Sequence, residues 1–151
     1  MKTSFKVSAV LPANRERLYK AWVSSKEHSG FTGGKARIQA KVGGRFTAWD
    51  GYIVGRTIAL EPSRRIVQSW RTTEFPSGSP DSRLEVLFDD ARTGTRVTLI
   101  HSQIPKGQAE QYRAGWREYY FAPMREYYSK STRPEPPSAR RATPRRRTGR
   151  K

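Results

Sequence analysis

The residues that could do chemistry in this chain are few and do not form a known catalytic pattern. His28 and His101 are the only histidines, and neither belongs to an HExxH or His-x-His motif that would favour a zinc site. Asp50 could act as a general base if an apolar wall raised its pKa. In a glycine-containing stretch, however, such a carboxylate more often accepts hydrogen bonds from backbone donors. We therefore expect no catalytic residue and no enzyme activity.

The sequence also gives little support for a metal site or for redox chemistry. The chain has no cysteine, which excludes disulfides, thiolate-ligated metals and thiol catalysis. No paired carboxylates and no nucleophile-base spacing occur either. We expect no metal and no cofactor.

Large aromatic side chains are more informative, because they come from every segment expected to surround a cavity. A mostly apolar pocket uses a few polar groups to orient its ligand, and Arg71, His101 and Tyr120 are the candidates. For His101, a hydrogen-bonded position in the interior is the alternative. The aromatics would also serve to fill a closed core, and the pattern fits both arrangements. The predicted ligand-binding residues are Trp22, Phe31, Trp49, Tyr52, Trp70, Arg71, His101, Trp116 and Tyr120.

Positive charge dominates the composition, with 30 Lys and Arg against 13 Asp and Glu and a formal net charge of +17. Residues 130–151 are rich in Arg, Pro, Ser and Thr and have almost no apolar surface to bury, which predicts a disordered basic tail. Such a tail attracts polyanions without reading sequence, since it lacks aromatics for base stacking. A purely solvated extension is the alternative. The predicted polyanion-binding residues are Arg140, Arg141, Arg145, Arg146 and Arg147.

The elements that must position these residues follow the order strand, helix, several strands and a long final helix. The helical spacing after Asn14, a plausible N-cap, contrasts with the strand-like alternation of residues 4–10. Residues 35–49 predict a hairpin with a two-residue turn at Gly43-Gly44. Further strands are predicted in residues 51–62, 64–75, 82–90 and 95–105, and the final helix in residues 107–128.

Two backbone features stand out within these segments. Gly51 and Gly55 predict a bulge or a close approach of two chains near Trp49 and Tyr52, at least one of which should face inward. Pro123 should kink the final helix, because proline removes a hydrogen bond and crowds the carbonyl four residues earlier.

Four stretches make the sequence recognisable: GGRFTAWDGYIVG, LEPSRRIVQSWRTTEFPSG, TRVTLIHSQIP and GWREYYFAPM. They resemble the family of activators of the heat-shock protein 90 ATPase, specifically its START-like (SRPBCC) C-terminal domain, over about residues 5–128. The resemblance implies a helix-grip fold with a hydrophobic cavity, and a chaperone of the heat-shock protein 90 type as partner. The eukaryotic co-chaperones carry a separate N-terminal domain with a Trp-His-Trp-containing motif. That motif does not occur here, so full co-chaperone action is not expected.

Together these observations predict an α+β protein. Residues 1–129 should form a START-like helix-grip domain, a curved antiparallel sheet of six to seven strands wrapped around a long C-terminal helix, followed by the basic tail at residues 130–151. The predicted function is non-enzymatic binding of a small hydrophobic ligand, such as a lipid, in the cavity. A chaperone-linked interaction module in the stress response and polyanion binding through the tail are the alternatives. No apolar run approaches the roughly 18 residues of a membrane span, and we expect a cytoplasmic protein.

Overall fold

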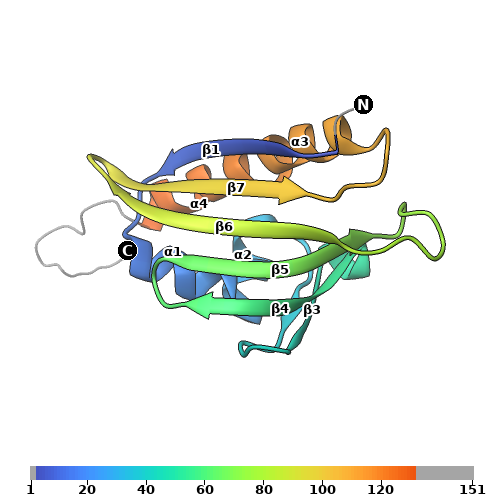
Figure 1. Cartoon of the computed structure of the whole chain (residues 1–151). Helices are drawn as coiled ribbons and strands as arrows, with labels where there is room; N and C mark the ends of the chain where they lie inside the picture. Colours follow the sequence, from blue (N-terminus) through green and yellow to red (C-terminus); the bar gives the residue numbers. More distant parts are fainter. Residues whose placement is uncertain (1–2, 132–151) are drawn as a thin grey trace, which may run out of the picture.

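The structure is a computed structural model that describes residues 3–131. Seven antiparallel strands form one curved sheet in the order β1-β7-β6-β5-β4-β3-β2, and the helices lie on one face of it (Figure 1). The strands are β1 (Phe5–Leu11), β2 (Arg37–Ile38), β3 (Arg45–Ala48), β4 (Ile53–Glu61), β5 (Arg65–Thr72), β6 (Ser82–Ala91) and β7 (Gly94–Ser102). The predicted α+β helix-grip architecture is confirmed, with seven strands.

Two short helices, α1 (Arg15–Trp22) and α2 (Ser25–Thr32), connect β1 to β2. The predicted N-cap is confirmed, because the Asn14 side chain accepts a hydrogen bond from the Arg17 backbone N–H at 2.8 Å. Leu18 and Trp22, four residues apart, are both buried. This apolar face anchors α1 in the core.

The final helix runs through three segments, α3 (Ala109–Trp116), a π-helical turn (Arg117–Phe121) and α4 (Ala122–Ser131), so it extends past residue 129. In the π turn the Ala122 N–H bonds to the Arg117 carbonyl, five residues back. Pro123 lies immediately after this turn and has no N–H for the Tyr119 carbonyl. The helix thus has a widened turn just before Pro123, the residue predicted to kink it, and this turn changes the direction of the side chains that follow.

Of the predictions that rest on glycines, the one at Gly43-Gly44 is wrong and the one at Gly55 is confirmed. A two-residue turn was predicted at Gly43-Gly44. The loop is longer than that, because β2 ends at Ile38 and β3 begins at Arg45. Of the two glycines, only Gly43 has a positive φ, at 83°. The close approach at Gly55 is confirmed, since a Cβ there would lie 1.9 Å from the Ser69 carbonyl oxygen.

The stretch around Asp50 is a turn rather than a bulge. A 3-10 turn at Trp49–Gly51 separates β3 from β4, and the β-bulge of this region lies later, between Thr57 and Ala59. Both Trp49 and Asp50 have left-handed backbone angles, with φ of 52° and 59°. These angles are unfavourable for residues with a side chain, and for a bulky one such as tryptophan in particular.

Candidate ligand-binding cavity

An apolar cavity of about 380 Å³ lies between the sheet and the final helix, near the β3–β4 turn. The sheet contributes one wall through β4 and β5, the Trp49–Tyr52 turn forms a second, and α3 with the π turn forms the third. The lining residues are Trp49, Tyr52, Ile53, Trp70, Gln111, Tyr112, Gly115, Trp116, Tyr119 and Tyr120.

The cavity exists partly because one helical position that faces it has no side chain. Gly115 lines the cavity one residue before Trp116, and a Cβ placed there would meet only the Tyr119 ring, at 3.9 Å. Tyr119, in the π turn, is 53% exposed and contacts the Trp49 ring edge to face at a centroid distance of 5.9 Å. Trp49 and Tyr119 thus form the outer rim of the cavity.

Trp49 is held in place by contact with backbone. A Cβ at Gly34 would lie 2.6 Å from the Trp49 ring, so only glycine allows the indole to pack there. The Trp49 indole N–H is buried without a hydrogen-bond partner among residues 3–131. A buried unpaired donor together with a left-handed φ is an unfavourable local arrangement, and both occur at the rim of the cavity.

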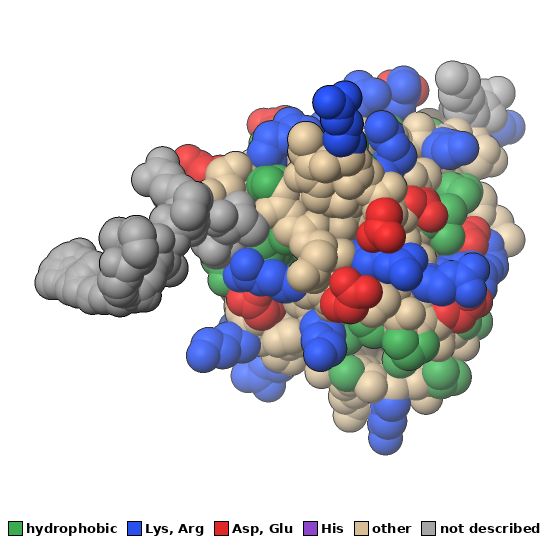
Figure 2. Space-filling view, turned by 90° about the vertical axis from the view of Figure 1, so that its left-hand side faces the viewer, with side chains coloured by type: hydrophobic (Ala, Val, Ile, Leu, Met, Phe, Trp, Pro, Cys, Tyr) green, Lys and Arg blue, Asp and Glu red, His purple; other side chains and the backbone are tan. Residues whose placement is uncertain are grey.

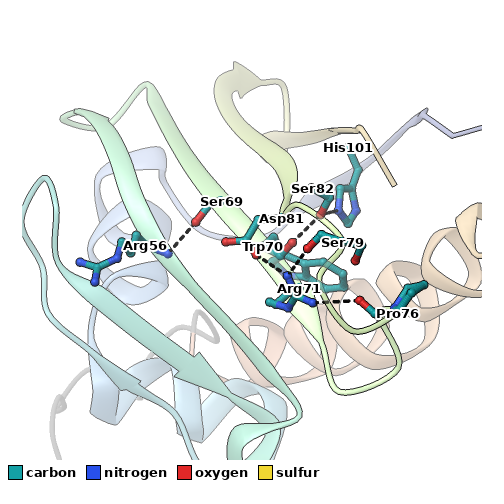
Figure 3. A network of polar contacts seen from close by, with 9 residues as sticks. All are labelled: Arg56, Ser69, Trp70, Arg71, Pro76, Ser79, Asp81, Ser82 and His101. Carbon is teal, nitrogen blue, oxygen red and sulfur yellow. Dashed lines mark hydrogen bonds and ion pairs between the residues drawn. The ribbon is translucent and has the colours of Figure 1, made fainter. Parts of the chain in front are cut away.

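A hydrogen-bonded chain behind the cavity fixes the two indoles of the inner wall. The Trp116 indole donates to His101 Nδ1 at 3.1 Å, which makes His101 Nε2 the protonated nitrogen. That nitrogen bonds to the Ser82 hydroxyl at 2.8 Å, and the hydroxyl donates to the Trp70 carbonyl at 2.7 Å (Figure 3). Burial lowers the pKa of His101 to about 3, so the imidazole is neutral at physiological pH.

The other end of the interlayer space is filled. His28 Nδ1 donates to the Trp22 carbonyl at 2.9 Å, and the Tyr120 hydroxyl donates to His28 Nε2 at 2.8 Å. Burial lowers the pKa of His28 to about 4, partly offset by its bond to the Trp22 backbone. The Trp22 ring contacts those of Phe31 and Trp116 at centroid distances of 6.2 Å. These aromatics close the core.

The cavity has few polar groups, and several are already bonded to protein. The Tyr112 hydroxyl donates to the Gln108 side chain at 2.6 Å and contacts the Thr72 hydroxyl at 2.7 Å. The Tyr52 hydroxyl donates to the Glu74 carboxylate, and burial together with this bond raises the pKa of Tyr52 to about 12. Gln111 and Tyr119 have exposed side chains without a hydrogen bond to residues 3–131, so together with the unpaired Trp49 indole N–H they are polar groups open to a ligand.

Of the nine predicted ligand-binding residues, five line the cavity: Trp49, Tyr52, Trp70, Trp116 and Tyr120. The other four lie elsewhere. Trp22 and Phe31 are in the closed core, and His101 is behind the wall, fully buried. Arg71 lies on the opposite face of the sheet, where it pairs with Asp81 at 2.9 Å (Figure 3).

Sequence reasoning missed five lining residues, of which Gln111, Gly115 and Tyr119 matter most. The helical period of apolar residues in the final helix includes Tyr112 and fits either Tyr119 or Tyr120 at the turn after Trp116. A glycine inside that helix was the available signal for space, because glycine is unfavourable in a helix interior and usually has a packing or functional reason there.

The catalytic candidates do not assemble into a site. Asp50 is exposed, and its carboxylate makes no hydrogen bond within residues 3–131, so the expected role of accepting backbone donors is wrong. Over the same range no three His, Asp or Glu side chains come together as metal ligands. No helix in this range is long and apolar enough to cross a membrane. The predicted polyanion-binding arginines, at positions 140, 141 and 145–147, lie outside the described residues.

Comparison with known proteins identifies a family that this chain matches. The family model described as "Activator of Hsp90 ATPase homolog 1-like protein" matches residues 12–129. The Activator of 90 kDa heat shock protein ATPase homolog 1 of Homo sapiens is 29% identical over 102 residues, which cover 68% of this chain and 30% of the human protein. A homolog from Dictyostelium discoideum is 28% identical over 100 residues, covering 66% of this chain and 26% of that protein. The chain thus spans about a third or less of these relatives' length.

Solved structures share the fold. The crystal structure of PFC0360w, an HSP90 activator from Plasmodium falciparum, superposes with a TM-score of 0.78 at 22% identity, over 85% of this chain and 97% of that one. Protein MLL2253 from Mesorhizobium loti gives a TM-score of 0.71 at 20% identity, over 87% and 99% of the two chains. At these identities the likeness shows the fold.

Proposed function

The chain belongs to the Activator of Hsp90 ATPase homolog 1-like family, and from that premise we propose that it is a non-enzymatic binding protein that holds a small hydrophobic ligand in its aromatic cavity. The family is named for activating the ATPase of another protein. A binding role without chemistry of its own agrees with that description.

The aromatic cavity is the observation that carries this proposal. A volume of about 380 Å³ is within the range of small-molecule sites, and an apolar lining with few polar groups is their usual composition. The His101 and Ser82 hydrogen bonds hold Trp116 and Trp70 in fixed positions. A rigid wall supports binding, because little side-chain freedom is lost when a ligand enters.

The chemistry of the wall favours an uncharged ligand. The lining contains no Lys, Arg, His, Asp or Glu, and a charged group placed there would lose hydration without gaining an oppositely charged partner. Ring faces from Trp70, Trp116 and Tyr112 suit flat apolar groups, and Gln111 offers one hydrogen bond at the opening. We therefore infer a small, neutral and mainly apolar ligand.

A fluorescence titration tests this function. N-phenyl-1-naphthylamine, a neutral apolar probe that brightens in apolar surroundings, should bind the full chain saturably with one site per protein. Unlabelled neutral aromatic compounds and fatty acids, added in turn, should displace it to different degrees and so rank the ligand classes. Emission that rises linearly without saturation would contradict the proposal.

A chaperone-linked interaction module is the second candidate, supported by the names of the relatives. The human relative is called an activator of the 90 kDa heat shock protein ATPase, and this chain aligns with 30% of its length. Partner binding through this domain is the part of that activity we propose here. Addition of a purified heat-shock protein 90 to the isotope-labelled chain should broaden its amide NMR signals. Unchanged signals at tens of micromolar would remove this candidate.

A further inference from the structure

The face of the sheet opposite the helices carries a group of arginines that the cavity does not use. We call it the arginine face, and it comprises Arg37, Arg45, Arg56, Arg71 and Arg83 from five successive strands. No helix of residues 3–131 covers this side of the sheet (Figure 1).

Strand register aligns these arginines in two rows. Arg83 pairs with Ser69, Ser69 with Arg56, and Arg56 with Arg45, so the first row crosses four strands. The second row runs from Arg71 through Val54 and Thr47 to Arg37. Directly paired residues point to the same face, with neighbouring strands about 4.8 Å apart and the two rows about 7 Å apart.

The β2–β4 side of this face has no compensating acid. Arg37, Arg45 and Arg56 are exposed and make no ion pair with any residue from 3 to 131. Arg45 and Arg56 stand directly opposite each other, an arrangement of like charges that destabilises a sheet. The Arg56 guanidinium bonds only to the Gly43 carbonyl, at 3.2 Å, and keeps most of its donors free.

Further along the strands, the same face of the sheet shows what a compensated surface looks like. Arg65 bonds to Glu61 at 2.7 Å and to Glu85 at 2.5 Å. At the end of the molecule that carries the β4–β5 and β6–β7 turns, acidic side chains are interspersed among the basic ones (Figure 2). Positive charge without nearby acids is therefore a local property of β2, β3 and β4.

We propose that the arginine face is a docking surface for an acidic patch on a partner protein. Guanidinium groups in fixed rows can form paired hydrogen bonds to carboxylates, which ammonium groups cannot. Exposed apolar residues lie beside them: Val42, 62% exposed, precedes the glycine that bonds to Arg56, and Ile58, 51% exposed, follows Arg56 on β4. Arginines next to exposed aliphatic side chains are typical of protein interfaces.

Nucleic acid fits this face less well. Sheets that bind single strands do so with aromatic side chains on which bases stack, and neither row contains an aromatic residue. A duplex groove admits a helix or a two-stranded ribbon, whereas these rows cross four strands. Charge complementarity with an acidic protein surface therefore explains the composition better. The inference is independent of the cavity and of its ligand.

The experiment compares two variants of the full chain with the same change in charge. Arg45→Glu with Arg56→Glu alters the arginine face, and Arg92→Glu with Arg96→Glu, both exposed, is the matched control at the β6–β7 hairpin. A fluorescent poly-glutamate 15-mer serves as the carboxylate probe and dT15 as the phosphate probe, both at 0.1 M salt. Amide NMR of the unmodified chain locates the binding.

Poly-glutamate should shift the amides of Thr47, Val54 and Ser69. Its affinity should fall about tenfold in the Arg45/Arg56 variant and less than about twofold in the control. Replacement of both arginines by Gln, which adds no acid, should give an intermediate loss. Equal losses in the two charge-matched variants, shifts confined to residues 132–151, or stronger shifts of the same amides by dT15 would each overturn the proposal.

Discussion

The two ends of the space between the sheet and the final helix contain the same kinds of residues, yet one is filled and the other is open. At the filled end, Trp22, His28 and Phe31 from α1 and α2 pack against Tyr120. At the open end no such helix intervenes, and the Trp49–Tyr52 turn faces α3 across the cavity. Aromatic content therefore does not distinguish a core from a binding site.

The filled and the open end differ in whether each aromatic ring has a side chain packed against it. A filled core requires a partner for every ring surface, which α1 and α2 provide at one end. At the other end, Gly115 lines the cavity without a side chain to fill it, since a Cβ there would meet only the Tyr119 ring, at 3.9 Å. The absence of one side chain, together with the position of a single turn, accounts for the cavity.

The largest effect should come from emptying the filled end. Trp22→Ala removes a side chain that is 2% exposed, and the free energy of unfolding should fall by about 3–5 kcal/mol. Tyr119→Ala, at the open rim and 53% exposed, should cost less than about 1 kcal/mol. Denaturant unfolding of both variants measures the contrast. Similar losses in the two would show that the open end is packed as tightly as the core.

Acid should act on both ends, because each contains a buried neutral histidine. The folded-state pKa values of His28 and His101 are lowered to about 4 and about 3, so below pH 6.5 the unfolded chain takes up protons that the folded chain does not. Stability is complete above pH 6.5 and decreases as the pH falls. Between pH 6.5 and 5 the free energy of unfolding should drop by about 3 kcal/mol.

Chemical unfolding at a series of pH values measures this drop. His28→Gln and His101→Gln should each remove about half of it, since each removes one titrating group. Asp and Glu titrate mainly below this window and contribute little to the slope. A free energy of unfolding that is constant from pH 6.5 to 5 would mean that the imidazoles are more accessible to protons than the structure indicates.

A side chain that fills the cavity should weaken ligand binding without lowering the free energy of unfolding. Gly115→Met places a flexible side chain into the open space, and the affinity for N-phenyl-1-naphthylamine should fall at least about tenfold, as expected when a ligand's volume is occupied. The free energy of unfolding should rise by up to about 1 kcal/mol, because glycine is unfavourable in a helix.

Ala114→Met is the matched control, since it introduces the same side chain at the preceding, exposed position of α3. It should leave probe affinity within about twofold of the unmodified chain, as surface substitutions generally do. Loss of binding in both variants would indicate a disturbance of the helix rather than a filled cavity.

The smallest effect concerns the strained turn at the open end. Asp50→Gly relieves a φ of 59°, and the free energy of unfolding should rise by about 0.5 kcal/mol after the greater flexibility of unfolded glycine is counted. Asp89→Gly, in strand β6, has no such strain to relieve and should lose about 0.5 kcal/mol. A loss of stability in Asp50→Gly, measured by thermal unfolding, would show that the aspartate side chain stabilises the turn.

The fold was predictable from sequence because periodicity changes clearly between strands and helices, and because the motifs around Trp70 and Trp116 resemble a known family. The site was predictable only in part. Arg71 illustrates a constraint that could have been applied: neighbours along a strand face opposite sides, so a cavity-facing Trp70 places Arg71 on the other face. Tyr119 could not have been assigned, since the π turn at Arg117–Phe121 alters the helical spacing that the assignment requires.

Indole NMR during titration with N-phenyl-1-naphthylamine distinguishes an open cavity from a closed core. The chain has four tryptophans, three of which line the cavity while Trp22 lies in the filled core, within 3.5 Å of the Gln68 side chain. We expect saturable shifts of the indole signals of Trp49, Trp70 and Trp116, with Trp22 moving least. Indole signals that do not move, or a Trp22 signal that moves as far as the other three, would contradict an open cavity beside a closed core.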